Sequence, residues 1–284
     1  MSEEGIAAAP HHVPSRLVIR PARKWVPVDL REIWDFRELL YFFVWRDVKV
    51  RYKQTALGFL WAFIQPLFMM VIFSFFFGRL AHIPSAGIPY ALFALTALLP
   101  WLLFSEGLTR ATNSMVSNAN IMTKVYFPRL IMPLAGILSP LIDFAVGFLL
   151  LIGMMVYFQV IPLPTIVFLP LFICLCLLCS FGVGIWLSAL NVLYRDFQYV
   201  VPFLIQVWFF ASPIVYPSYV VPQDLQVLYW LNPMTGVIEG TRWALYGTPL
   251  PFELLTLSCG VLALVIIIGL FYFRKMEQYF ADVV

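Results

Sequence analysis

The chain has 284 residues, of which 62% are hydrophobic and 12% are charged, whereas a soluble domain is about 45 to 50% apolar and about 25% charged. So few charges cannot cover a water-soluble protein of this size, which excludes a soluble enzyme. The four cysteines and the aperiodic glycines and prolines also exclude a disulfide scaffold, a collagen-like chain and a disordered chain. The composition predicts an all-α polytopic membrane protein.

The chain begins with two segments that are too polar to cross a membrane. Residues 1–28, with four prolines and scattered basic residues, predict a flexible tail. Residues 29–53 predict an amphipathic interface helix, since Asp29 and Glu32 have the spacing of an acidic capping box and apolar residues then recur at helical spacing. This helix can be a simple membrane anchor or a docking surface for another protein. Its candidate residues are Trp34, Arg37, Trp45 and Arg46.

Runs without charge predict six transmembrane helices within a domain at 54–284. The run 144–194 has 51 residues and would be about 77 Å long as one helix, against about 30 Å of hydrocarbon. It must therefore turn, and Pro162 and Pro164 mark the turn. The predicted spans are about 55–78, 88–105, 130–158, 165–193, 199–221 and 253–273.

The basic residues predict the orientation of these spans. With both termini in the cytosol, 16 of the 18 Lys and Arg residues lie inside, and only Arg79 and Arg242 lie outside. No signal peptide is expected, because the first strongly apolar run starts beyond residue 38 without a cleavage site.

Two connections are unusual. The inner one, 106–129, has 24 residues, more than a helix hairpin needs, and its Thr, Ser and Asn residues favour a short capped helix. Met115, Ile121 and Met122 have no bilayer to enter there, so either a partner protein covers them or the segment is a solvated connector.

The outer connection, 222–251, is too apolar for a loop and too broken for a span, which predicts two short re-entrant helices. A passive lid and a moving gate both fit it, and Glu239 and Arg242 can pair at i and i+3.

The sequence offers little chemistry. No glycine is followed by lysine, so the chain has no P-loop and is not itself the ATPase. No catalytic motif and no metal site is predicted, and Cys174, Cys176 and Cys179 are interpreted as packing residues. Asp143 is the one acid well inside a predicted span, so we expect it to face protein or water rather than lipid. A structural hydrogen bond or a channel-facing position suits it better than a proton relay, which needs further ionisable groups.

Aromatic residues gather in the first and fifth predicted spans. Their flat faces can stack weakly on sugars, which suits a polymer that must slide, or they can simply face lipid. The candidates are Phe59, Trp61, Phe203, Trp208, Tyr216 and Tyr219.

Four separated motifs resemble one family. RDVKVRYKQTALGFLWAFIQPL (46–67), NANIMTKVYFPRLIMPL (118–134), NVLYRDF (191–197) and LNPMTGVIEGTRWALYG (231–247) look like the membrane subunit of ABC-2 type exporters of polysaccharides and polyol phosphates. The resemblance covers about residues 25–280.

The resemblance implies a homodimeric permease in the bacterial inner membrane, partnered with two copies of a separate subunit that binds ATP and Mg²⁺. It implies a path for a lipid-linked glycan along the aromatics of the first and fifth spans, and no cofactor or nucleic acid bound by this chain. By the same resemblance, the ATPase-coupling residues are Asn118, Asn120, Lys124 and Arg129, and the outer-gate residues are Asn232, Pro233, Glu239 and Arg242.

The substrate is less well defined. The favoured one is a polysaccharide of O-antigen type, and teichoic acid, capsular polysaccharide, and a small lipid or drug are the alternatives within the superfamily. A membrane-embedded transferase that uses Asp143 or Glu106 is the alternative from another class.

Overall fold

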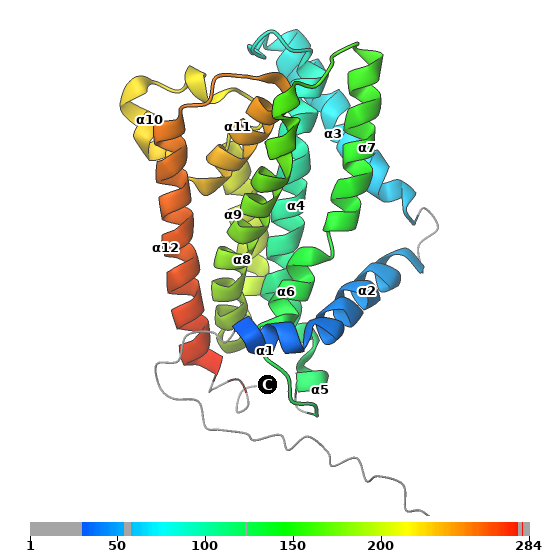
Figure 1. The fold of residues 1–284 in the computed structure, drawn as a ribbon, viewed down its shortest axis with the longest axis vertical. Coiled ribbons are helices and arrows are strands. Elements are labelled where there is room, and N and C mark those ends of the chain that lie inside the picture. The colour runs from blue at the N-terminus through cyan, green and yellow to red at the C-terminus, as the bar shows by residue number, and fades with distance from the viewer. Residues whose placement is uncertain (1–29, 54–57, 123, 278–279, 281–284) are drawn as a thin grey trace, which may run out of the picture.

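The computed structural model describes residues 30–53, 58–122, 124–277 and 280, and most of them are helical. The predicted tail 1–28 and the capping residue Asp29 lie outside these described residues. The long helices run roughly side by side along the molecule (Figure 1). One end carries α1, α5 and the last turns of α12, and the other carries α10 and α11. We refer to these as the α5 end and the α11 end.

The first half of the chain contains α1 (Leu30–Asp35), α2 (Arg37–Lys53), α3 (Leu60–Phe73), the π-helical turn η1 (Ser74–Leu80), α4 (Tyr90–Ser117), α5 (Ala119–Met122), α6 (Ile131–Leu138) and α7 (Leu141–Tyr157). The second half contains the 3-10 turn η2 (Pro164–Phe168), α8 (Leu169–Leu193), α9 (Phe197–Phe210), the 3-10 turn η3 (Ser218–Val220), α10 (Gln223–Trp230), α11 (Pro233–Tyr246) and α12 (Phe252–Glu277).

Within the described part of the chain, five helical stretches are long and apolar enough to cross a membrane, namely Leu60–Leu80, Tyr90–Ser117, Ile131–Tyr157, Pro164–Leu193 and Phe252–Glu277. They establish a polytopic helical membrane protein, as predicted. The expected turn near residues 159–164 is also confirmed, because α7 ends at Tyr157 and the next helical turn begins at Pro164. Gln159, between them, has a left-handed backbone with φ of 57°.

The predicted fifth span, 199–221, is wrong in its second half. α9 has only 14 residues and ends at Phe210. Because the helix does not continue, no helical N–H reaches the carbonyl of the next residue, Ala211. That carbonyl accepts a hydrogen bond of 3.1 Å from the side chain of Asn232 instead. The stretch up to α10 is irregular apart from η3.

The predicted inner loop, 106–129, is also wrong in its first half, because α4 continues to Ser117. Polar residues suggested a loop here. Their side chains instead donate hydrogen bonds to carbonyls of their own helix, so they do not compete with helical structure. Thr109 donates to Ser105 O at 2.8 Å, Asn113 to Thr109 O at 3.0 Å and Ser114 to Ala111 O at 2.7 Å.

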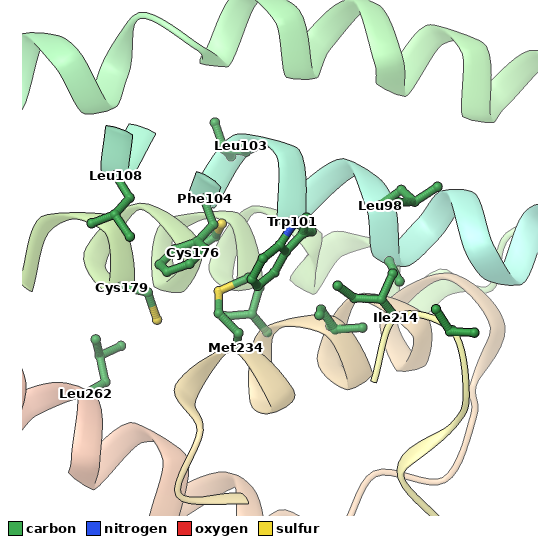
Figure 2. Close-up of a cluster of buried hydrophobic side chains, with 14 of the residues drawn as sticks. Leu98, Trp101, Leu103, Phe104, Leu108, Cys176, Cys179, Ile214, Met234 and Leu262 are labelled. Carbon is green, nitrogen blue, oxygen red and sulfur yellow. The ribbon is translucent and has the colours of Figure 1, made fainter. Parts of the chain in front are cut away.

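α4 lies at the centre of the bundle and contacts α3, α6, α7, α8, α9 and α11. Its bulky side chains fill a core in which Trp101 and Phe104 point toward Met234 of α11 and the cysteines of α8 (Figure 2). Cys176 and Cys179 are buried in this core, and the Cys176 thiol donates to the Pro100 carbonyl at 3.2 Å. These two cysteines therefore pack, as predicted, whereas Cys174 is exposed.

α8 and α12 touch through glycines. A Cβ atom on Gly269 of α12 would lie 2.6 Å from the Gly182 carbonyl oxygen of α8, closer than real contacts allow. Small residues at such crossings let helix backbones approach in a membrane, where apolar area alone provides little association energy.

We expect Gly269→Val to lower the stability of the detergent-solubilised protein by about 1 to 3 kcal/mol, because the new side chain forces α8 and α12 apart. Thermal unfolding measures this. Gly260→Val is the matched control on the same helix, because a Cβ atom there meets nothing within 4 Å. Equal losses for the two variants would show that the close approach is unimportant.

Candidate functional site

The first surface of interest is formed by α1 and α2 at the α5 end. Their inward side packs on an apolar group that we call the inner cluster, which also includes residues of α4, α6, α8 and α12. Phe43 of α2 is buried in it and lies 5.9 Å, ring to ring, from Phe127. The segment predicted as an interface helix is thus helical over its described residues, with a turn at Phe36 between its two parts.

The opposite side of α1 and α2 carries Trp34 and Trp45, two of the candidate residues of the predicted interface helix. Large aromatic side chains are exposed on it, namely Trp34, Tyr41, Phe42 and Trp45. Arg37 donates to the Trp34 carbonyl at 3.3 Å, and Arg46 pairs with Asp47 at 2.8 Å while covering the Phe43 ring. The helix therefore presents one apolar side to its own chain and one side of aromatic and charged residues outward, which suits a headgroup layer.

The four predicted coupling residues lie in the segment between α4 and α6, but they divide into two kinds. Asn120 and Lys124 are exposed. Asn118 donates to the Ser114 carbonyl at 2.8 Å and so closes the end of α4. Arg129 is half-buried and turns toward the end of α12, where its guanidinium donates to the Glu277 carbonyl. The expectation that Met115 is exposed is wrong, since it is fully buried in the inner cluster.

The segment between α4 and α6 exposes three consecutive side chains. Lys124, Val125 and Tyr126 are all exposed. Tyr126 donates to Glu32 of α1 at 3.3 Å, and partial burial together with this carboxylate raises the pKa of its hydroxyl. This hydrogen bond ties the segment to α1.

A charged cluster joins α2 to the bundle. Asp143, in the first turn of α7, accepts hydrogen bonds from the Arg51 guanidinium and the Tyr52 hydroxyl of α2. Glu106 of α4 lies 4.0 Å from Arg51 and 3.4 Å from Arg110. Asp143 therefore faces protein, as predicted, and the cluster borders a small pocket that Gln65 and apolar side chains of α3, α4 and α7 also line.

The aromatic candidates of α3 and α9 also divide into two kinds. Phe59, Trp61, Phe203 and Tyr219 are each more than half exposed. Trp208 instead turns inward, where its ring lies 5.0 Å from Phe104 and its indole N–H donates to Asn232 at 2.8 Å. Tyr216 is half-buried and donates to the Phe210 carbonyl at 3.1 Å.

Asn232 connects α9 to α11 at the α11 end. Its side-chain oxygen accepts from Trp208 and also from the Met234 backbone N–H at 3.0 Å, which makes Asn232 the N-cap of α11. Its amide donates to Ser212 at 2.9 Å as well as to Ala211. Pro233 follows at the first position of the helix, where a missing N–H costs nothing.

Glu239 and Arg242 pair as predicted, at 3.5 Å, but both are buried within the chain. Arg242 is 1% exposed, lies 3.6 Å over the Phe93 ring and donates to the Ile214 carbonyl at 3.1 Å. Glu239 accepts from the Ser218 backbone N–H at 2.8 Å. The pair thus holds the irregular stretch after α9 against α4 and α11.

The fold defines a polytopic helical membrane protein in which the inner cluster lies against α1 and α2. Residues 38–246 match the family model of the ABC-2 type transporter. The chain belongs to that family.

Curated relatives agree with this assignment. The chain is 29% identical to an O-antigen export system permease protein, RfbA, of Klebsiella pneumoniae over 87% of this chain and 95% of the relative. It is 28% identical to an RfbA of Myxococcus xanthus over 78% and 85% of the two chains. It is also 26% identical to the polysialic acid transport protein KpsM of Escherichia coli over 70% and 78%.

We expect Asp143→Ala to lower stability by about 1 to 3 kcal/mol, because it leaves the Arg51 guanidinium without its closest carboxylate in a partly buried site. The exchange of Arg51→Asp with Asp143→Arg should recover about half of this loss in thermal unfolding. Glu106→Gln is the control and should cost less, since Glu106 lies farther from Arg51. An exchanged pair that is no more stable than the single variants would show that charge is not what joins α2 to α7.

Proposed function

We propose that this chain is the permease subunit of an ATP-driven exporter that passes a lipid-linked polysaccharide of O-antigen type across the bacterial inner membrane. The observation that carries the proposal is the family match, which includes α2, α3, α9 and α11 in one continuous range. The two RfbA permeases, which share more identity with the chain than KpsM does, favour O-antigen over capsular polysaccharide.

ATP hydrolysis belongs to a partner in this proposal. The sequence lacks a P-loop, so ATP and Mg²⁺ bind to a separate subunit, and the permease needs no cofactor of its own. That subunit docks at the α5 end, where Asn120 and Lys124 are exposed, while Asn118 and Arg129 hold the docking segment in place. The complex consists of two permease chains and two ATP-binding subunits.

The membrane topology follows from the same assignment. α9 with the irregular stretch after it makes the fifth of six crossings, and α10 and α11 are re-entrant helices on the outer side. Both termini then lie in the cytosol, with residues 1–28 as a tail. The aromatic and charged outward side of α1 and α2 supports a position in the inner headgroup layer.

The polysaccharide moves along the exposed rings of α3 and α9. Phe59, Trp61, Phe203 and Tyr219 offer flat apolar faces on which sugar rings stack weakly. A single chain leaves this surface open, so a second copy encloses the path. The side chains of Trp208 and Tyr216 are partly buried and engaged in hydrogen bonds, so we assign them the role of supporting α9.

The outer gate is placed in this proposal at the irregular stretch 211–222 rather than at α11, which carries the predicted gate residues. Glu239 and Arg242 are buried and therefore hold this stretch, while Asn232 and Pro233 fix the start of α11. A transferase activity is disfavoured because Asp143 and Glu106 are both engaged by arginines.

The function is tested in cells that lack their own O-antigen permease and that express this chain with its ATP-binding subunit. We expect polysaccharide to appear on the cell surface. Phe203→Ala and Trp61→Ala should each lower its amount about fivefold, since an aromatic contact contributes about 1 kcal/mol, while ATP hydrolysis continues. The amount is measured with a polysaccharide-specific antibody.

Phe271→Ala is the matched control, because Phe271 is an equally exposed ring on α12, away from the proposed path. Its export should equal that of the unchanged chain. ATP hydrolysis by the purified permease alone, or equal export losses for Phe203→Ala and Phe271→Ala, would contradict the proposal.

Labelling tests the topology. We expect a membrane-impermeant thiol reagent to modify Ser85→Cys, which lies between η1 and α4, in intact cells. Ser117→Cys, at the other end of α4, should react only after the membrane is opened. The opposite pattern would reverse the proposed orientation.

A further inference from the structure

Arg129 is turned away from the surface on which its three companion residues were predicted to act. It lies just before α6, yet its guanidinium donates to the carbonyl of Glu277, the last residue of α12. The same guanidinium lies 5.7 Å over the ring of Phe280. Carbonyls in the last turn of a helix lack helical donors, and a cation is favoured there by the helix dipole. Arg129 thus caps α12 from a distant segment.

The chain beyond α12 is packed where it is described. Phe280 is 1% exposed, and its ring lies 5.5 Å from that of Phe273 at an angle of 74°. Both rings belong to the inner cluster, together with Phe127 and Leu130 of the segment between α4 and α6. Arg274 pairs with Glu277 at 2.8 Å in the same turn. The end of α12 is therefore joined to that segment by an apolar and a charged contact.

The segment between α4 and α6 is held on its other side as well. Phe127 packs on Phe43 of α2, and Tyr126 donates to Glu32 of α1. Ile121 and Met122 of α5 are half-buried against the same inner cluster. Contacts with α1 and α2 on one side and with α12 on the other leave the exposed residues 124–126 facing outward.

We propose that Arg129, the Glu277 carbonyl and Phe280 form a clasp that positions the docking segment for the ATP-binding subunit. Arg129 is then a positioning residue that acts through Phe280, and Phe280 becomes part of the docking machinery. This inference rests on the proposed function, because it assumes that the ATP-binding subunit docks at the α5 end.

The test titrates the full-length permease, reconstituted in lipid vesicles, with its ATP-binding subunit and follows ATP hydrolysis. With Phe280→Ala we expect the half-saturating concentration of the ATP-binding subunit to rise about tenfold, while the maximal rate of ATP hydrolysis stays unchanged. Phe280→Leu keeps an apolar side chain and should recover most of the affinity. Phe271→Ala removes an exposed ring from α12 and should change nothing.

Arg129→Ala tests whether the two residues act together. It should raise the half-saturating concentration by a similar factor, and Arg129→Lys should recover part of it. The double variant Arg129→Ala with Phe280→Ala should resemble either single variant instead of multiplying their effects.

Several outcomes would overturn the clasp. One is an unchanged half-saturating concentration for Phe280→Ala, and another is a double variant whose effects multiply. A third is a fall in maximal rate that follows a fall in thermal stability, which would mean that Phe280 only stabilises the fold. If the unchanged permease fails to bind the ATP-binding subunit at all, the proposed function itself is wrong, and the clasp with it.

Discussion

The packing of α8 against α4 is the contact on which the other elements depend. Polar side chains of α8 meet carbonyls of α4 along its length, because Cys176 donates to Pro100, Ser180 to Phe104 and Asn191 to Thr112. These bonds satisfy polar groups that lipid cannot, and they fix the register of the two helices. α3, α7, α9 and α11 then pack on α4, and α12 packs on α8. The exposed and buried faces of each element follow from this arrangement.

Different interactions stabilise the two ends of the bundle. At the α5 end an apolar cluster joins α1, α2, the docking segment and the end of α12, with charges at its edge. At the α11 end the irregular stretch after α9 is held by hydrogen bonds from Asn232 and Arg242. An apolar cluster tolerates small sliding movements, whereas directional bonds in a low-dielectric site favour one geometry. This difference suits the two roles proposed above, a docking surface at the α5 end and a gate at the α11 end.

Much of the fold was accessible from the sequence, because charge-free runs and prolines mark spans and turns directly. The ends of α4 and α9 were predicted wrongly, because side-chain hydrogen bonds set them and the spacing of apolar residues does not reveal such bonds. Thr109 and Asn113 return their polar groups to their own helix, so α4 extends past the predicted loop boundary. Asn232, twenty-one residues away in sequence, occupies the Ala211 carbonyl where α9 ends. Similarly, Glu277, whose carbonyl accepts from Arg129, lies 148 residues away in sequence, so no local sequence pattern predicts this contact.

The 14 residues of α9 have a consequence for the membrane around the protein. A helix of that length measures about 21 Å, whereas the hydrocarbon layer measures about 30 Å. Lipid that borders such a helix must thin, or polar backbone after Phe210 must enter the layer beside protein. Along this face the hydrocarbon layer is therefore either thinned or interrupted by polar backbone. The polysaccharide path proposed above follows the same face, where the barrier to a hydrophilic polymer is lowest.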